Sequence, residues 1–89
     1  MKSNYNIQFT KEASKVLRKL DKATARRIVQ SIELLSTDPY NHPQTKQMKG
    51  YEGGIYRLKI GNFRVIYEII DDRLLIIVVR IGPRGDVYK

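Results

Sequence analysis

The chain has 89 residues, 42% of them hydrophobic, and its 17 lysines and arginines outnumber nine acidic residues, which gives a formal net charge of +8. This length supports one domain with one hydrophobic core, so we expect residues 1–89 to form a single domain. The absence of cysteine excludes disulfides and thiolate metal sites. The charge predicts nucleic acid or an acidic protein as partner, and no segment is apolar over the length that spans a membrane. The first residues lack the apolar core of a signal peptide, which predicts a cytoplasmic location.

The first 39 residues have the pattern of one strand followed by two helices. Apolar and polar residues alternate over about residues 3–9, as in a half-buried strand. Thr10 and Asp21 suit the N-caps of two amphipathic helices, and Pro39 ends the second helix. Two such helices form a hairpin whose apolar side needs a sheet to cover it. The apolar positions with helical spacing are Ala13, Val16, Leu17 and Leu20, then Ala25, Ile28, Val29, Ile32 and Leu35.

Residues 39–54 form the longest connection in the chain. Its two prolines and three glycines argue against regular structure through most of it. Lys46 and Lys49 add positive charge to this connection. It also holds His42, the single histidine of the chain, which we expect to be an exposed loop residue without a catalytic role.

Residues 56–88 have the pattern of three antiparallel strands in succession. Gly61 and Asn62 form a turn signal between the first two strands, and residues 71–73 mark the second reversal. The last strand, over residues 74–81, is apolar on both faces, as in a central strand. The expected fold is therefore α+β: an N-terminal strand and a two-helix hairpin packed on one face of a mainly antiparallel sheet of about four strands.

Cations gather on the sheet face that the helices leave uncovered. Arg57 and Lys59 are two residues apart, so their side chains project from the same face, and the turn brings Arg64 beside them. The last strand delivers Arg80, Arg84 and Tyr88 to its far end. Several cations and a phenol on one face predict a site for a polyanion. Part of that face is also expected to stay apolar and exposed until a protein partner covers it.

The chemistry open to such a site is limited. The sequence has no second histidine, no cysteine, no glycine-rich phosphate loop before a helix and no carboxylate cluster with ligand spacing, so we expect neither a cofactor nor a metal. Cations and phenols suffice for attack of an RNA 2′-hydroxyl on the adjacent phosphate, with Lys59 between Arg57 and Arg64 as the base. The alternative is that these cations only solvate the sheet or hold phosphates without chemistry.

Two segments, YRLKIGNFRVIYEI and RIGPRGDVY, resemble those of the RelE-type toxins of the RelE/ParE superfamily, and the resemblance extends over the whole chain. In that family an aromatic residue and a basic pair two apart precede Gly-x-aromatic-Arg and an apolar strand. The matching residues here are Tyr56, Arg57, Lys59, Gly61, Phe63 and Arg64. The family's tail, Ile-Gly-His-Arg-x-x-Val-Tyr, is matched by Ile81, Gly82, Arg84, Val87 and Tyr88, with Pro83 in place of the histidine.

The resemblance implies the toxin of a type II toxin–antitoxin system, an endoribonuclease that cleaves messenger RNA in the ribosomal A site. It implies a catalytic set of Arg57, Lys59, Arg64, Arg84 and Tyr88. The base would be Lys59 or Tyr88, and Tyr88 could instead stack on a base of the RNA. Arg64 would hold the scissile phosphate, Arg57 would clamp a phosphate and Arg84 would lie near the leaving oxygen. Residues expected to grip 16S ribosomal RNA are Lys46, Lys49, Arg80, Lys15, Arg18, Lys19 and Arg26.

The resemblance also implies an acidic RelB-like antitoxin, partly disordered, that folds as it wraps around the toxin. Operator DNA would be bound only through that antitoxin. Two other readings of the same fold stay open. One is a ParE-like toxin that poisons DNA gyrase by binding, and the other is a catalytically silent regulator that binds the antitoxin.

Overall fold

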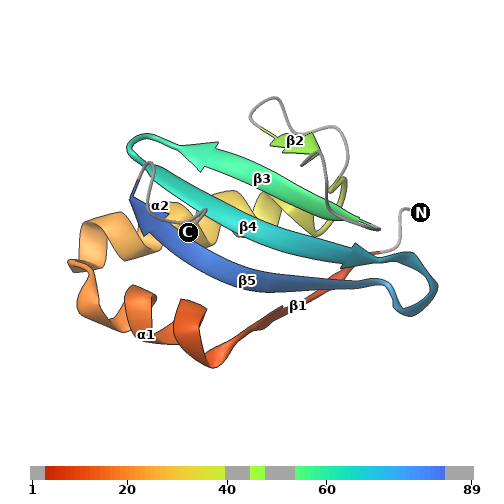
Figure 1. Ribbon diagram of the computed structural model, residues 1–89, viewed down its shortest axis with the longest axis horizontal. Coiled ribbons are helices and arrows are strands. Elements are labelled where there is room, and N and C mark those ends of the chain that lie inside the picture. The colour runs from red at the N-terminus through yellow and green to blue at the C-terminus, as the bar shows by residue number, and fades with distance from the viewer. Residues whose placement is uncertain (1–3, 40–44, 48–53, 84–89) are drawn as a thin grey trace.

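The computed structural model describes residues 4–39, 45–47 and 54–83. These residues form two α-helices, one short 3-10 helix and five strands (Figure 1). In chain order the elements are β1 (Asn6–Phe9), α1 (Lys11–Lys19), α2 (Lys22–Leu35), β2 (Thr45–Gln47), β3 (Ile55–Ile60), β4 (Phe63–Ile70), the 3-10 helix (Asp71–Arg73) and β5 (Leu75–Pro83).

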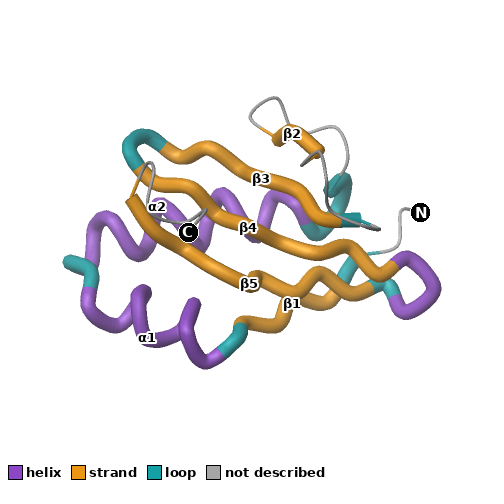
Figure 2. Tube along the Cα trace, in the orientation of Figure 1, coloured by secondary structure: helices purple, strands orange, loops and turns teal. Residues whose placement is uncertain are grey.

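The five strands form one sheet in the order β1-β5-β4-β3-β2 (Figure 2). β1 pairs with β5 in parallel, and all other neighbours are antiparallel. Figure 1 looks onto the face of the sheet that the helices leave uncovered: α2 lies behind β3 and β4, and α1 lies by the edge made by β1 and β5. The expected α+β arrangement, a helix hairpin on one face of a mainly antiparallel sheet, is confirmed.

The sheet has one strand more than the expected four. β2 is three residues long, is polar, and pairs with β3 at the sheet edge. It lies inside residues 39–54, between prolines and glycines. A strand of three residues is too short to show an alternating pattern, so the sequence does not predict it. His42 and Lys49 lie outside the described residues.

The helix starts follow the predicted caps. Thr10 accepts a hydrogen bond from the Ala13 backbone N–H, and Asp21 accepts one from the Thr24 N–H, which lowers the pKa of Asp21. The predicted end of the second helix is wrong, because α2 stops at Leu35, four residues before Pro39. The hydroxyls of the two residues after Leu35, Ser36 and Thr37, donate to the carbonyls of Glu33 and Leu34, and such local bonds compete with continuation of a helix.

The core lies between the helices and the sheet. The buried residues from the helices are Ala13, Ile28, Ile32 and Leu35, and those from the strands are Leu58, Ile60, Val65, Tyr67, Ile69, Ile76, Val78 and Ile81. On β3 these buried residues alternate with Arg57 and Lys59, as predicted. Because the core uses only one face of the sheet, the other face is available for a site. We call it the outer face.

Tyr67 of β4 connects the edge strand β2 with the segment that follows α2. Its phenol donates to the Pro39 carbonyl at 3.0 Å and lies 3.1 Å from the Thr45 hydroxyl, and its ring stacks on Tyr56 at 5.8 Å between centroids. Burial raises the pKa of Tyr67 to about 12.

Among the residues that the structure describes, no helix is long and apolar enough to cross a membrane.

Candidate nucleic-acid interface

Five cations of the described strands lie on the outer face. Lys59 on β3 pairs directly with Arg64 on β4, and Arg57, two residues before Lys59, pairs with Ile66. Since residues opposite each other on neighbouring strands project from the same face, Lys59, Arg64 and Arg57 form one group. The same register adds Lys46 of β2, which pairs with Arg57, and Arg80 of β5, which pairs with Ile66. We call Lys46, Arg57, Lys59, Arg64 and Arg80 the cation face.

The turn between β3 and β4 fixes this arrangement. Ile60 pairs with Phe63, so Gly61 and Asn62 alone close the hairpin, as predicted. Gly61 has a φ of +56°, a value that hairpin turns of two residues require and that L residues adopt at a cost. A different turn would shift the pairing, and Lys59 would no longer face Arg64.

The members of the cation face differ in exposure. Lys46 and Lys59 are exposed, whereas Arg64 is 7% exposed and its Nη1 donates to the Phe63 carbonyl at 3.3 Å. The Nε atom of Arg57 is also buried. A partly dehydrated guanidinium interacts with an anion more strongly than one in water, because the local dielectric is lower. The face therefore combines the buried guanidinium of Arg64 and the partly buried guanidinium of Arg57, which can hold a phosphate, with exposed ammonium groups beside them.

Arg80 is tied to the first turn of α1. Its Nε lies 3.6 Å from Oε2 of Glu12, and both side chains are exposed to solvent, at 46% and 71%. Among the described strands, the acidic residue on the outer face is Glu68, which pairs with Ile55 and Ile77 farther along the sheet. Glu68 and the cations thus occupy different parts of the face.

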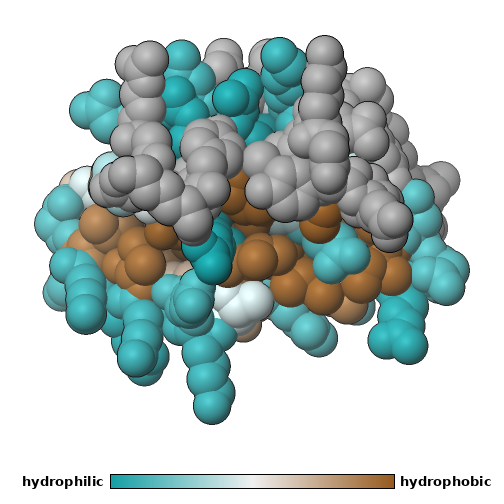
Figure 3. All heavy atoms as spheres, in the orientation of Figure 1, coloured by the Kyte–Doolittle hydropathy of each residue, from teal (hydrophilic) through white to brown (hydrophobic). Residues whose placement is uncertain are grey.

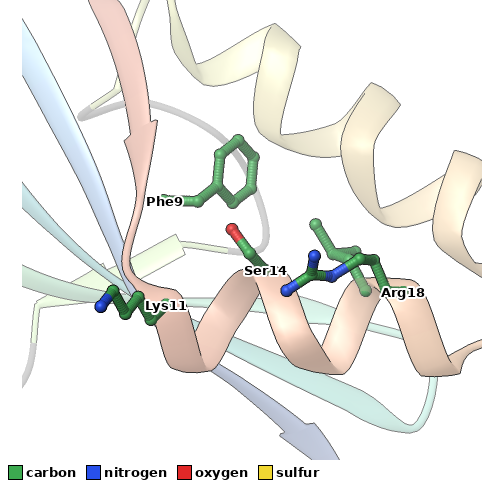
Figure 4. A pocket seen from close by; sticks show the side chains of 5 residues that line it. Phe9, Lys11, Ser14 and Arg18 are labelled. Atoms are coloured by element: carbon green, nitrogen blue, oxygen red, sulfur yellow. The ribbon is translucent and has the colours of Figure 1, made fainter.

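The other predicted binding residues of the described chain lie on the helical layer. They are Lys15, Arg18, Lys19 and Arg26, and all four are exposed. Arg18 lines a shallow pocket together with Phe9, Lys11, Ser14 and Leu17 (Figure 4). In that view the Ser14 hydroxyl points toward the Phe9 ring, between the pocket's two cations. The sequence-based set therefore splits into the cation face and a second basic surface on α1 and α2.

Part of the predicted site lies outside the described residues. Arg84, Tyr88 and Lys49 belong to this part, so the described geometry brings together Arg57, Lys59 and Arg64 of the catalytic set and Lys46 and Arg80 of the binding set. Within the described ranges no group of three or more histidine, aspartate or glutamate residues is placed to hold a metal ion.

The expected exposed apolar face is only partly present. Ile66 of the outer face is buried, at 8% exposed, while Ile70, Leu75 and Ile77 of the same face are partly exposed. Figure 3 shows apolar residues running across this face with hydrophilic residues around them. The exposed large apolar residues of the described chain are elsewhere, at Leu34 on α2 and at Leu74 in the turn before β5. Leu74 has a φ of +49°, and β5 begins one residue later than predicted.

Known proteins are similar to this chain in both sequence and fold. A model of the ParE toxin family of type II toxin–antitoxin systems (parDE) matches residues 7–88. A putative RelE-like toxin protein of Escherichia coli is 32% identical over 96% of this chain and 90% of that protein. The putative toxin RelE1 of Methanocaldococcus jannaschii is also 32% identical, over 96% of both chains.

Solved structures agree. The crystal structure of the archaeal RelE–RelB complex from Pyrococcus horikoshii OT3 has a chain with a TM-score of 0.81 and 27% identity, covering 93% of this chain and 98% of that one. The RelBE2 toxin–antitoxin complex of Mycobacterium tuberculosis follows at a TM-score of 0.79 and 25% identity, covering 93% and 94%. A two-helix layer on this mixed sheet with a basic outer face is thus the scaffold of a small toxin. The chain belongs to the ParE toxin family and is a RelE-like toxin of a type II toxin–antitoxin system.

Proposed function

We propose that this toxin is a metal-independent endoribonuclease that cleaves messenger RNA in the ribosomal A site and so inhibits translation. The observation that carries the proposal is the pairing of Lys59 with Arg64 across β3 and β4, with Arg57 on the same face. The pairing puts an exposed amine beside a buried guanidinium, the two kinds of group that the reaction needs. The sequence resemblance adds Arg84 and Tyr88 to this catalytic set.

The proposed reaction is an intramolecular displacement at phosphorus. A base, Lys59 or Tyr88, removes the proton of the 2′-hydroxyl, whose oxygen attacks the adjacent phosphorus. The bond from phosphorus to the 5′-oxygen breaks, and the leaving oxygen gains a proton, so the products are a 2′,3′-cyclic phosphate and a 5′-hydroxyl. Arg64 holds the phosphate through two parallel hydrogen bonds and, with Arg57, stabilises its extra negative charge. Arg84 stabilises the charge on the leaving oxygen.

The ribosome positions the RNA in this proposal. The cation face is one open side of a sheet. Because positioning of the reacting groups supplies a large share of the rate of such a reaction, we assign that positioning to the ribosome. Lys46, Lys49, Arg80 and the helix cations Lys15, Arg18, Lys19 and Arg26 then bind 16S ribosomal RNA without reading its sequence. Ribosomes and messenger RNA are cytoplasmic, and so is the proposed site of action.

The proposed protein partner is an acidic RelB-like antitoxin. Two similar structures are the RelE–RelB complex of Pyrococcus horikoshii OT3 and the RelBE2 toxin–antitoxin complex of Mycobacterium tuberculosis, so these relatives bind such antitoxins. The net charge of +8 and the partly exposed outer-face residues Ile70, Leu75 and Ile77 are complementary to an acidic, partly apolar segment. Operator DNA would be reached only through this antitoxin.

The second candidate is a ParE-like toxin that binds DNA gyrase. The family description that matches residues 7–88 names ParE toxins, which favours this candidate, whereas the curated relatives carry RelE names. Two assays separate them. Primer extension on a defined message, with and without programmed ribosomes, detects cleavage, and a supercoiling assay detects inhibition of gyrase. A-site cuts that need ribosomes support the nuclease, inhibition of gyrase without cuts supports the ParE-like alternative, and silence in both leaves the antitoxin-binding regulator.

A further inference from the structure

The pairing of β4 with β5 contains a β-bulge. Ile66 pairs with Arg80, but the next residue of β4, Tyr67, pairs with Val78, so Val79 has no opposite residue on β4. The bulge explains the spacing of the buried residues of β5, which are two apart at Ile76 and Val78 and then three apart at Ile81.

The bulge decides which face Arg80 occupies. In a regular strand Arg80 would share the face of Val78 and point to the helices, and Ile81 would point outward. The extra residue reverses this order, so Ile81 enters the core and Arg80 joins the cation face. Membership of Arg80 in that face therefore depends on a local backbone irregularity.

Thr10, the N-cap of α1, is bonded to the bulge itself. Its backbone N–H donates to the Val78 carbonyl at 3.1 Å, and its hydroxyl donates to the carbonyl of the bulged Val79 at 2.7 Å. The hydroxyl oxygen also accepts from the Ala13 N–H at 3.2 Å. Figure 1 shows this junction, where the chain leaves β1 and enters α1 beside β5.

The dual use of one hydroxyl points beyond helix capping. An N-cap needs only an acceptor, and aspartate or asparagine caps as well as threonine does. The bond to Val79 needs a donor, because a carbonyl displaced from the ladder by a bulge requires another partner. Two residues along the same turn, Glu12 meets the Arg80 side chain at 3.6 Å. The start of α1 thus contacts β5 at two points: Thr10 binds the carbonyl of Val79, the residue before Arg80, and Glu12 lies beside the Arg80 guanidinium.

We propose that Thr10 is a positioning residue for RNA binding: its hydroxyl holds the bulge at Val79 and thereby keeps Arg80 on the cation face, with Glu12 orienting the guanidinium. The inference rests on the proposed function only in naming RNA as the ligand. Arg80 would contact a phosphate, and Thr10 would act through Arg80 without touching RNA.

The test uses the full chain and a fluorescent 2′-O-methyl RNA oligonucleotide, which binds but has no 2′-hydroxyl to attack phosphorus. Arg80→Ala removes the contact, Thr10→Val removes the hydroxyl at nearly constant shape, and Thr10→Ser restores it. Asp21→Ala is the matched control, because it removes the cap of α2, which is remote from the bulge. The double variant Thr10→Val/Arg80→Ala completes a cycle.

We expect Arg80→Ala to weaken binding by about tenfold and to reduce the salt slope by about 0.7, the value of one phosphate contact on a single strand. Thr10→Val should reproduce both changes and add nothing in the Arg80→Ala background. Thr10→Ser should restore binding, and Asp21→Ala should leave the salt slope unchanged. Additive losses for Thr10→Val and Arg80→Ala would overturn the inference, because they would mean that Thr10 acts on the fold in general.

NMR of the free protein tests the structural half without RNA. Cross-strand contacts between Ile66 and Arg80 should weaken in Thr10→Val and persist in Thr10→Ser and Asp21→Ala. Unchanged contacts in Thr10→Val would refute the role of the hydroxyl, whatever the RNA results. If the parent protein does not bind RNA but Thr10→Val loses these contacts, RNA is not the ligand of Arg80 and the bulge assignment stands; A-site cleavage on programmed ribosomes tests the proposed function separately.

Discussion

Lys59 and Arg64 face each other across the β3–β4 hairpin, and only Gly61 and Asn62 separate the two strands along the chain. One side chain is exposed and the other is almost fully buried. The pair therefore presents a solvated amine beside a partly dehydrated guanidinium at a fixed spacing. Its geometry depends on a two-residue turn, which gives the first prediction.

Gly61→Ala should destabilise the protein and disturb the pair together. An alanine Cβ would meet the Arg27 guanidinium at an ordinary 3.6 Å, so the cost comes from the φ of +56°. We expect the free energy of unfolding to fall by about 1–2 kcal/mol, measured by urea denaturation. Gly61→Asn, which tolerates this conformation better, should lose less. Equal stability of Gly61→Ala and the parent would contradict the turn geometry.

The base is tested by separating binding from rate. Lys59→Arg keeps the positive charge but supplies a group that does not release its proton near neutral pH, so RNA binding should persist while cleavage falls. A general base typically contributes about 10²–10⁴-fold in rate, and single-turnover cleavage on programmed ribosomes should show a loss of that order. Tyr88→Phe tests the alternative base in the same assay. Full cleavage by Lys59→Arg would leave Tyr88 as the candidate.

Tyr67 makes the stability of the protein fall in alkaline solution. The phenol titrates near 10 in the unfolded chain and at about 12 in the fold, because burial disfavours its ionised form. The neutral phenol is therefore favoured by folding: stability is unaffected below pH 10 and declines as the pH rises from 10 to 12. Tyr67→Phe should lose about 1 kcal/mol at pH 7 and show a shallower decline above pH 10. Parallel curves for the two proteins between pH 10 and 12 would refute this role.

The outer face is the proposed seat of the antitoxin. Ile77→Thr keeps a β-branched residue in β5 and removes apolar surface, so it should weaken the antitoxin complex by about tenfold or more. Leu34→Thr, an apolar loss of the same kind on exposed α2, should leave the affinity unchanged. Isothermal titration with the purified antitoxin measures both. The opposite ranking would place the antitoxin on the helical layer.

The sequence predicts the features that depend on neighbouring residues along the chain. The helix caps at Thr10 and Asp21, the turn at Gly61 and the inward alternation along β3 all follow from local chemistry and are confirmed. β2 could not be predicted, since three polar residues have no period and the strand forms only by pairing with β3. The end of α2 depends on hydroxyl-to-carbonyl bonds that compete with the helix, and the pattern of apolar residues does not record them.

The candidate site shows a similar division. The placement of Arg57, Lys59 and Arg64 on one face follows from period-two alternation and one turn. Arg80 was expected near them from its position at the end of the strand, but the reason is a bulge that alternation does not predict. The spacing of Val78 and Ile81, both apolar and three apart, was the available signal. Thr10 was recognised as a cap, and its second role became visible only with β5 beside it.

Cleavage of a defined message on programmed ribosomes, followed by primer extension, tests the central claim most directly. The parent protein should cut within A-site codons, and Arg64→Ala and Arg84→Ala should abolish the cuts. Arg73→Ala, which removes an exposed cation at the turn before β5, is the matched control and should cut as the parent does. Circular dichroism confirms that each variant is folded. Cuts by folded Arg64→Ala and Arg84→Ala at the rate of the parent would contradict the assignment of these two arginines to the catalytic site.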